Sequence, residues 1–305
     1  MSIVPSPVTP ALVARLRAAG CVYAEDEADL LVAAAADAAD LDAMVRRRVE
    51  GLPLEQVLGW AEFCGLRIAV EPGVFVPRRR TEFLAHQAVA LARRHAAPVV
   101  VDLCCGAGAI AAVLAAEVDG AEPHAADVDP VAVACARRNL PADRVHHGDL
   151  FAALPPDLRG RVAVLVANAP YVPTGELAFM PADARLHEAV IALDGGPDGL
   201  DVQRRVITGA AGWLAPGGTL LIETSERQAP RTAGAMRAAG LAVRTTTDPD
   251  LDATVVLGTL PLRPRPASTV ENDVVVGVDR SNRHRPRSGR GRGGWAHRPW
   301  TAPPR

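Results

Sequence analysis

Residues 99–110 read Val99-Val100-Val101-Asp102-Leu103-Cys104-Cys105-Gly106-Ala107-Gly108-Ala109-Ile110, and they hold the clearest structural signal in the chain. The β-branched run is typical of a strand that is buried on both faces of a parallel sheet. The small residues after it predict a tight turn, because glycine lets the backbone approach a ligand that a side chain would exclude. Ala-rich sequence then predicts a helix whose first N–H groups are free. This order of strand, acid, turn and helix predicts a cofactor-binding loop.

Strands and helices alternate from this turn to about residue 260. The predicted strands are 99–103, 124–127, 145–149, 162–166, 219–223, 241–245 and 253–260. The predicted helices are 83–94, 109–118, 131–140, 200–214 and 230–239. This alternation predicts an α/β fold with a Rossmann-like, seven-stranded, mostly parallel sheet and helices on both faces. The last two strands are joined without a helix, which predicts one antiparallel edge strand.

The sequence divides into four predicted parts. Residues 1–52 predict a small N-terminal helical domain that docks a substrate, with helices over 10–20, 25–39 and 41–49. Residues 53–82 predict a hairpin linker, in which Gly65 lies near the turn of a hairpin over 60–70. Residues 83–260 form the predicted α/β domain. Residues 261–305 are rich in Arg, Pro and Gly and predict a disordered tail, because such a segment buries too little apolar surface.

Charge is distributed unevenly along the 305 residues. The formal net charge is −2, and all 33 basic residues counted as Lys or Arg are arginine. Eight of them lie between Arg280 and Arg305, where Asp and Glu are absent. The rest of the chain is acidic, so whole-protein charge does not favour nucleic-acid binding. Only the tail has the composition for a weak nucleic-acid contact.

The sequence does not favour a membrane protein, a metalloprotein or a disulfide-stabilised protein. Apolar runs stay below the roughly 20 residues that a membrane-spanning helix needs, and residues 1–10 lack the order of a secretory signal. The five cysteines are scattered without CxxC spacing, which predicts neither a disulfide framework nor a metal site. We therefore expect a cytoplasmic monomer that contacts no membrane and binds no metal.

Acidic side chains stand at the ends of three successive predicted strands. Asp102 ends the first strand, Asp127 the second and Asp149 the third. Ligands of open α/β sheets bind at the carboxyl ends of the strands, and an acid about twenty residues after the glycine turn can bind the hydroxyls of a ribose. Asp149 could then accept a hydrogen bond from an amine such as that of adenine. Each acid taken alone would more often be a helix cap, but their succession predicts a nucleoside-binding edge.

The fourth strand ends in Asn168-Ala169-Pro170-Tyr171, a pattern that suits methylation of a planar nitrogen. Such a nitrogen is a poor nucleophile, and two acceptors aimed at its hydrogens would favour the transition state. The Asn168 side-chain oxygen and the Ala169 carbonyl can be these acceptors. Pro170 restricts the backbone of the residue before it, and Tyr171 can stack on the flat group. The alternative interpretation is a turn after a buried strand, with Tyr171 as filler.

With these motifs the chain resembles class I S-adenosylmethionine-dependent methyltransferases of the release-factor glutamine methyltransferase family (HemK/PrmC). The resemblance covers about residues 12–260. It rests on the motifs above and on Pro53-Leu54-Glu55-Gln56-Val57-Leu58-Gly59, Glu62-Phe63, Val76-Pro77-Arg78, Thr81-Glu82 and Ala192-Leu193-Asp194-Gly195-Gly196-Pro197-Asp198-Gly199-Leu200. The resemblance implies methyl transfer from S-adenosylmethionine to a glutamine amide in a protein, typically the Gly-Gly-Gln motif of a peptide-chain release factor. The N-terminal helices would help to dock that factor.

The resemblance also implies the site residues. The cofactor would be bound by Asp102, Cys104, Cys105, Gly106, Ala107, Gly108, Asp127, Asp149, Leu150 and Asn168. Catalysis would use Asn168, Ala169, Pro170 and Tyr171. The same four residues, with Phe75, Pro77 and Arg78, would contact the substrate.

Several positions depart from the family pattern. Cys104 stands where the family usually has Gly, and Ala169 where it has Pro, although Ala169 keeps the backbone carbonyl. Arg79 and Arg80 replace a usual Pro and acid, which leaves the protein substrate open and allows a paralogous branch. Two rival functions stay open: an amino-methyltransferase for adenine in DNA or RNA, and a cofactor-binding adaptor without catalysis.

Overall fold

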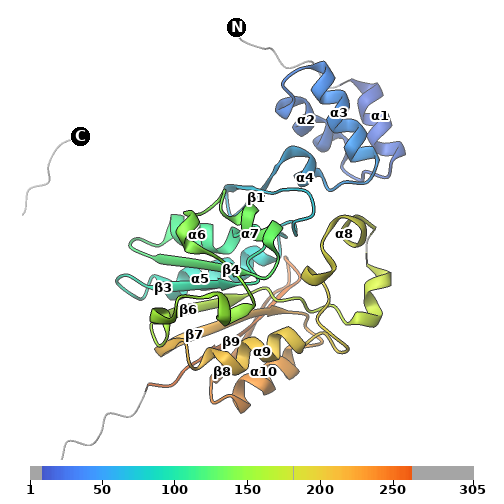
Figure 1. The fold of residues 1–305 in the computed structure, drawn as a ribbon. Helices are drawn as coiled ribbons and strands as arrows, with labels where there is room; N and C mark the ends of the chain where they lie inside the picture. Colours follow the sequence, from blue (N-terminus) through green and yellow to red (C-terminus); the bar gives the residue numbers. More distant parts are fainter. Residues whose placement is uncertain (1–8, 181, 263–305) are drawn as a thin grey trace, which may run out of the picture. The chain divides into compact units, whose positions relative to one another are not determined.

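The main sheet sets the position of every candidate site residue. The computed structural model of the chain describes residues 9–180 and 182–262. Within them the main strands are β3 (Val99–Leu103), β4 (Glu122–Asp127), β5 (Val145–His147), β6 (Val162–Ala167), β7 (Leu214–Thr224), β8 (Ala242–Asp248) and β9 (Ala253–Thr259). These seven strands form one sheet in the order β5-β4-β3-β6-β7-β9-β8 (Figure 1). The predicted seven-stranded, mostly parallel α/β fold is confirmed.

The antiparallel strand does not lie at the edge where the sequence analysis expected it. β9 pairs antiparallel with both β7 and β8, so it lies inside the sheet, and β8 forms the edge. The expectation failed because a two-strand hairpin can add to a sheet through either of its strands. β9 is the more apolar of the two: Val255, Val256 and Leu257 are buried, whereas most of β8 is exposed or half-buried. Burial therefore favours β9 as the inner strand.

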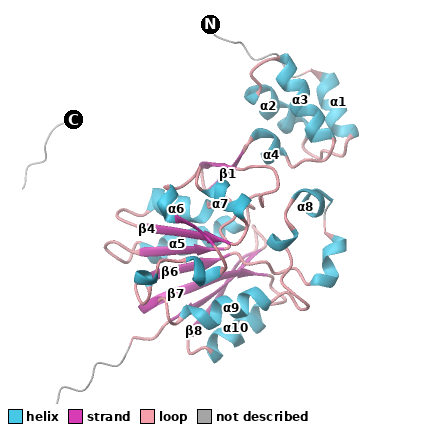
Figure 2. Cartoon of the chain, in the orientation of Figure 1, coloured by secondary structure: helices cyan, strands magenta, loops and turns pink. Residues whose placement is uncertain are grey.

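Helices cover both faces of this sheet (Figure 2). One face carries α5 (Thr81–Ala92), α6 (Ala109–Glu117) and α7 (Pro130–Ala136), and the other carries α9 (Asp201–Ala210) and α10 (Ala229–Ala238). α7 and α9 are shorter than predicted. The predicted helix 200–214 ends at Ala210 because Leu214 already belongs to β7 and pairs with Val162.

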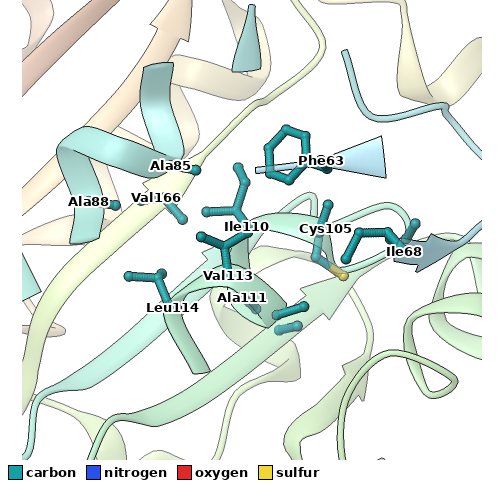
Figure 3. Packing of buried hydrophobic residues seen from close by; sticks show 14 of the residues in the cluster. Phe63, Ile68, Ala85, Ala88, Cys105, Ile110, Ala111, Val113, Leu114 and Val166 are labelled. Atoms are coloured by element: carbon teal, nitrogen blue, oxygen red, sulfur yellow. The ribbon is translucent and has the colours of Figure 1, made fainter. Parts of the chain in front are cut away.

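Two hydrophobic clusters fill the space between the sheet and its helices. Side chains of successive β3 residues point to opposite faces, so Val100 joins one cluster while Val99 and Val101 join the other. Figure 3 shows Ile110, Val113 and Leu114 of α6 in the first cluster, near Val166 of β6. Each such buried aliphatic side chain contributes about 1.5–3 kcal/mol by leaving water. All five β3 residues are buried, as expected for a strand covered on both faces.

The N-terminal helices form a third cluster of their own. They are α1 (Pro10–Ala18), α2 (Ala24–Ala34), α3 (Ala38–Val49) and the short α4 (Leu54–Leu58). Leu16, Leu31 and Val45 form the centre of that cluster, which also includes Val57 of α4. The predicted second helix ends earlier than expected, because Asp37 caps α3 by accepting hydrogen bonds from the N–H groups of Ala39 and Asp40.

Two further segments flank the sheet. The predicted hairpin is confirmed as β1 (Trp60–Phe63) and β2 (Leu66–Ala69), and Gly65 has the positive φ of +75° that its turn requires. Between β6 and α9 runs a segment that the sequence analysis did not resolve. It holds the 3-10 turns η4 (Thr174–Phe179) and η5 (Val190–Ala192) and the helix α8 (Ala182–His187). Gln56 of α4 anchors it by donating to the His187 carbonyl at 3.3 Å.

The remaining short elements are the 3-10 turns η1 (Ala142–Arg144), η2 (Leu150–Ala153) and η3 (Pro156–Leu158). Helices long and apolar enough to cross a bilayer are absent from the described residues. The predicted tail, residues 261–305, lies outside the described residues apart from Pro261 and Leu262.

Candidate active site

The parallel register brings the ends of three strands to one level. Leu103 of β3 pairs with Ala126 of β4 on one side and with Ala167 of β6 on the other. The residues that follow these strand ends therefore meet at the carboxyl edge, next to the point where the strand order reverses between β3 and β6. A cavity of about 350 Å³ opens there.

The cavity brings together nearly all of the residues predicted for the site. Its lining includes Phe75, Pro77, Arg78, Asp102, Cys104, Cys105, Gly106, Ala107, Asp127, Asp149, Leu150, Asn168, Ala169, Pro170 and Tyr171. Gly108 is the exception. It precedes α6 with φ +76°, and an added Cβ would lie 3.1 Å from Leu140 and 3.2 Å from Ala136. Its geometry serves the packing of α6.

Asp102 is hydrogen-bonded to the helix that follows the glycine turn. Its Oδ2 accepts a hydrogen bond from the Ala111 N–H at 3.3 Å, which ties β3 to the first turn of α6. Burial raises the pKa of this carboxyl group to about 8. Its Oδ1 has no partner among the described residues. The ammonium group of a bound amino acid would supply the missing partner of Oδ1 and would favour the ionised form of this carboxyl.

Asp127 is held by backbone N–H groups. Its Oδ2 accepts from Gly106 at 2.9 Å and its Oδ1 accepts from Asp129 at 2.9 Å. Burial raises the pKa of Asp127, while these N–H donors oppose that rise. Each carboxylate oxygen has a further lone pair, so the fixed side chain can accept from two adjacent hydroxyl groups. This arrangement fits the ribose of a nucleoside cofactor.

Asp149 and the two cysteines complete the cofactor side. The Asp149 Oδ2 is 2.5 Å from the guanidinium of Arg205, and both side chains are about half exposed. Asp149 therefore meets the cavity as part of an ion pair that the sequence analysis did not foresee. Burial raises the pKa of both Cys104 and Cys105. These thiols stay protonated, which agrees with the interpretation of the pair as small turn residues.

The predicted acceptor motif follows β6 directly. The Asn168 Nδ2 donates to the Thr81 Oγ1 at 3.3 Å, so the amide group faces the start of α5 through its nitrogen. Ala169 is fully buried. The Tyr171 carbonyl accepts from the Gln228 side chain at 3.0 Å. The motif is therefore held from both its side chain and its backbone.

Glycines of the segment 193–200 fit against the backbone of this motif. A Cβ at Gly195 would lie 2.7 Å from the Pro170 carbonyl oxygen, and one at Gly199 would lie 2.3 Å from that of Tyr171. The Val172 N–H donates to the Leu193 carbonyl at 3.1 Å. The segment thus acts as a backbone support that only glycine permits at these contacts.

Tyr171 has charges of both signs near it. The Arg80 guanidinium is 5.8 Å from the centre of its ring, and Arg80 also lies 3.5 Å from the Glu223 carboxylate. Burial, reinforced by the charge of Glu223, raises the pKa of Tyr171 to about 12. The phenol is therefore neutral at physiological pH.

A second arginine is held at the cavity by the segment between β6 and α9. The Arg78 guanidinium lies 2.6 Å from Glu188, whose Oε1 also accepts from the Val76 N–H at 3.2 Å. Arg78 also lies 4.9 Å from the ring centre of Phe75. These contacts fix the wall that the sequence analysis assigned to substrate binding.

Further lining residues were not predicted as site residues. Arg80 and Thr81 line the cavity, as do Arg205, Met180 and Ile191. Thr81, known from the sequence only as part of a family motif, begins α5, and its hydroxyl contacts Asn168. Arg80 carried a detectable signal, because it departs from the family pattern. Arg205 on α9 and Met180 after η4 carried none.

The comparisons with known proteins agree with this geometry. Residues 65–197 match the methyltransferase small domain family. The catalytic domain of hMettl16 is structurally similar with a TM-score of 0.50 and 15% identity, over 73% of this chain and 83% of that one, which supports the fold. The sheet, the glycine turn and the acids at the strand ends define an S-adenosylmethionine-dependent methyltransferase.

Sequence relatives narrow this class. A release factor glutamine methyltransferase of Streptomyces coelicolor is 40% identical over 198 residues, covering 62% of this chain and 70% of that protein. The chain belongs to the release factor glutamine methyltransferase family. A 4-amino-L-phenylalanine/4-methylamino-L-phenylalanine methyltransferase of Streptomyces pristinaespiralis is 39% identical over 203 residues, covering 64% of this chain and 69% of that protein. Two relatives whose names give different methyl acceptors thus have nearly the same sequence identity to this chain, 40% and 39%.

Proposed function

We propose that this enzyme transfers a methyl group from S-adenosylmethionine to the side-chain amide nitrogen of a glutamine in a peptide-chain release factor, at its Gly-Gly-Gln motif. The observation that carries the proposal is the orientation of Asn168. Its Nδ2 faces Thr81, which leaves Oδ1 for a donor in the cavity. The names of relatives such as the Streptomyces coelicolor enzyme support the same acceptor.

Asn168 and Ala169 act on the acceptor nitrogen. An amide lone pair is delocalised, so the nitrogen becomes nucleophilic only as it pyramidalises and gains positive character. Two oxygens that accept its N–H groups stabilise this state more than the planar ground state. The Asn168 Oδ1 is one acceptor and the Ala169 carbonyl is the other. Tyr171 is a neutral phenol with a pKa of about 12, so it stacks on the amide and does not act as a base.

The residues of the other cavity wall fit S-adenosylmethionine. Asp127 would hold the ribose hydroxyls, Asp149 with Leu150 would flank the adenine, and the turn from Cys104 to Gly106 would contact the methionine part. When bound, this cofactor supplies an electrophilic methyl group on a sulfonium. The acceptor nitrogen, held by the Asn168 Oδ1 and the Ala169 carbonyl, would take this methyl group, leave the sulfur as a neutral thioether and release its own proton to water.

The N-terminal helices, which belong to the predicted docking domain of residues 1–52, are proposed to help dock the release factor. Val22 and Tyr23 between α1 and α2 are 81% and 70% exposed, which leaves apolar surface for a partner. Acceptor and enzyme would meet in the cytoplasm.

The direct test is a methyl-transfer assay with the purified full-length chain. Labelled S-adenosylmethionine is incubated with a release factor and with a variant factor in which Ala replaces the Gln of Gly-Gly-Gln. We expect label in the wild-type factor only, and mass spectrometry of its peptides should place one methyl group on that Gln. The Asn168→Ala enzyme serves as the catalytic control.

Two outcomes would reject this acceptor. Label found only in DNA or RNA would establish the adenine alternative. A cofactor that binds without transfer to protein, nucleic acid or small amines would establish the adaptor alternative.

A second acceptor class is favoured by Arg80. A guanidinium that lines the cavity beside the Tyr171 ring can bind the carboxylate of a free amino acid whose aromatic amine is methylated. The relative from Streptomyces pristinaespiralis is named for such an acceptor. Including 4-amino-L-phenylalanine in the same assay separates the two classes. Label in this compound, lost in an Arg80→Gln enzyme, with none in the release factor, would select the second class.

A further inference from the structure

Glu223 is a buried charged residue behind the acceptor motif. It follows Ile222 of β7, which pairs with Ala167 of β6, so Glu223 lies level with Asn168 on the neighbouring strand. Glu223 is 2% exposed and is not part of the cavity lining. Neither of its carboxylate oxygens completes a hydrogen bond of ordinary geometry within the described residues. Burying an unsatisfied carboxylate costs free energy of folding, so we expect this side chain to serve a function.

Two cavity residues face this carboxylate. Arg80 approaches it at 3.5 Å through Nε. Burial raises the pKa of Glu223, and the neighbouring Thr81 hydroxyl and the charge of Arg80 oppose that rise. Thr81 is itself 4% exposed, and its Oγ1 accepts from the Asn168 Nδ2. Thr81 therefore neighbours both Glu223 of the sheet and Asn168 of the cavity.

Counting donors at Glu223, Thr81 and Asn168 favours one orientation of the Asn168 amide. Both Glu223 oxygens lack a donor among the described residues, and an ionised carboxylate only accepts hydrogen bonds, so the neighbouring Thr81 hydroxyl can direct its single proton to Glu223. The Thr81 oxygen is then left only as an acceptor toward Asn168. Asn168 must present its NH₂ group to Thr81, and its Oδ1 turns toward the cavity. Without this constraint, the two orientations of an asparagine amide are close in shape and in energy.

We propose that Glu223 and Thr81 are positioning residues, which set the side-chain amide of Asn168 so that its oxygen meets the acceptor nitrogen. This inference rests on the role that the proposed function gives to Asn168, whichever amine or amide is the acceptor. A flipped amide would present NH₂ to an N–H donor, and the transition state would lose one of its two acceptors. Arg80, 3.5 Å from the carboxylate, favours the ionised form of Glu223 and so supports the order of donors.

The proposal predicts a specific pH dependence. A protonated Glu223 can donate to Thr81, whose proton is then free to point at Asn168 and permit the flip. Arg80, Thr81 and Tyr171 face Glu223. The charge of Arg78 also lowers the pKa of Tyr171. The wild-type kcat should therefore fall at acidic pH with the titration of Glu223.

Threonine variants give the first test. Thr81→Val removes the hydroxyl at nearly constant volume, and we expect kcat to fall on the order of 100-fold while KM and cofactor affinity stay close to wild type. Thr81→Ser keeps the hydroxyl and should restore most of kcat. Thr208→Val, which removes the hydroxyl that donates to the Arg204 carbonyl at 2.8 Å on the exposed side of α9, is the matched control and should keep wild-type kcat.

Glu223→Gln gives the second test. The neutral amide can donate or accept, so the order of donors is lost at every pH. We expect a lower kcat without the acidic fall, whereas a purely structural role would lower Tm and leave the shape of the pH profile unchanged.

An NMR measurement keeps the inference separate from the choice of acceptor. In the full chain labelled with ¹⁵N-asparagine, the Asn168 side-chain NH₂ should exchange slowly in wild type and in Thr81→Ser, and quickly in Thr81→Val. Equal exchange in all three, or an unchanged kcat in folded Thr81→Val, would overturn the inference. Failure of the release-factor assay alone would reject the acceptor and leave the NMR result to decide the role of Thr81.

Discussion

The two sides of the cavity are held in place in different ways. On the cofactor side, Asp127 accepts backbone N–H groups from Asp129 and Gly106, which are 2 and 21 residues away. On the acceptor side, Asn168 contacts Thr81 at a separation of 87 residues, and Arg78 contacts Glu188 at a separation of 110. Backbone N–H groups hold Asp127 on the first side, whereas contacts between side chains of distant segments hold Asn168 and Arg78 on the second.

This difference has a functional meaning. The cofactor side binds a constant molecule, and backbone groups suit it because they do not change with the side chains. The acceptor side must match a particular substrate, so its shape depends on side chains that can vary independently. Substitutions on the two sides should therefore change different kinetic constants, which gives four predictions.

The largest effect is expected for Asn168→Ala. Loss of one of two preorganised acceptors should lower kcat by at least about 10²–10³-fold. Cofactor affinity, measured by isothermal titration calorimetry, should change little, because Asp127 and the glycine turn are untouched. An Asn168→Ala enzyme with normal turnover would remove this residue from catalysis.

Asp127→Asn should mainly lower the affinity for the cofactor. Replacing a charged acceptor by a neutral amide weakens its hydrogen bonds by about 1.5–3 kcal/mol, or roughly 10- to 100-fold in cofactor affinity. The kcat at saturating cofactor should stay near wild type. Asp119→Asn, a change at an exposed position, is the control. An equal loss in both variants would contradict the assignment of Asp127.

Asp102→Asn tests the buried carboxyl through pH. Burial raises its pKa from 3.8 to about 8, so between these values the folded chain keeps a proton that the unfolded chain has lost. Stability must therefore fall as pH rises across this range. Asparagine carries no such proton, so the Tm of the variant relative to wild type should increase from about pH 5 to about pH 8.5. Parallel Tm curves without cofactor would show that Asp102 does not titrate in this way.

The smallest effect is expected for Asp149→Asn. Its ion pair with Arg205 is about half exposed, and such pairs contribute about 0–1 kcal/mol. Cofactor affinity should fall by less than about fivefold, and the loss should shrink at high salt. A much larger, salt-independent loss would show that Asp149 contacts the cofactor more strongly than its exposure suggests.

The same contrast explains what the sequence could predict. The buried run of β3, the acids at the strand ends and the Asn168 motif follow from local patterns, and the structure gathers them at one edge. Thr81 and Glu223 could not be joined to Asn168, because their contacts depend on the packing of α5 and β7 against β6. Leu214 was assigned to a helix because Pro216 and the following glycines resemble a turn. In the structure they lie within β7, where a Cβ at Gly218 would be 2.5 Å from the Val162 carbonyl oxygen.

The glycines behind the acceptor motif have a consequence for how this protein tolerates mutation. A Cβ at Gly199 would overlap the Tyr171 carbonyl oxygen at 2.3 Å, and Gly199 also has a φ of +76°. Neither Gly195 nor Gly199 is part of the cavity lining. In a saturation mutagenesis screen scored by activity, these two positions should tolerate substitution as poorly as Asn168. Some of the positions most sensitive to substitution would then be residues that never touch either substrate.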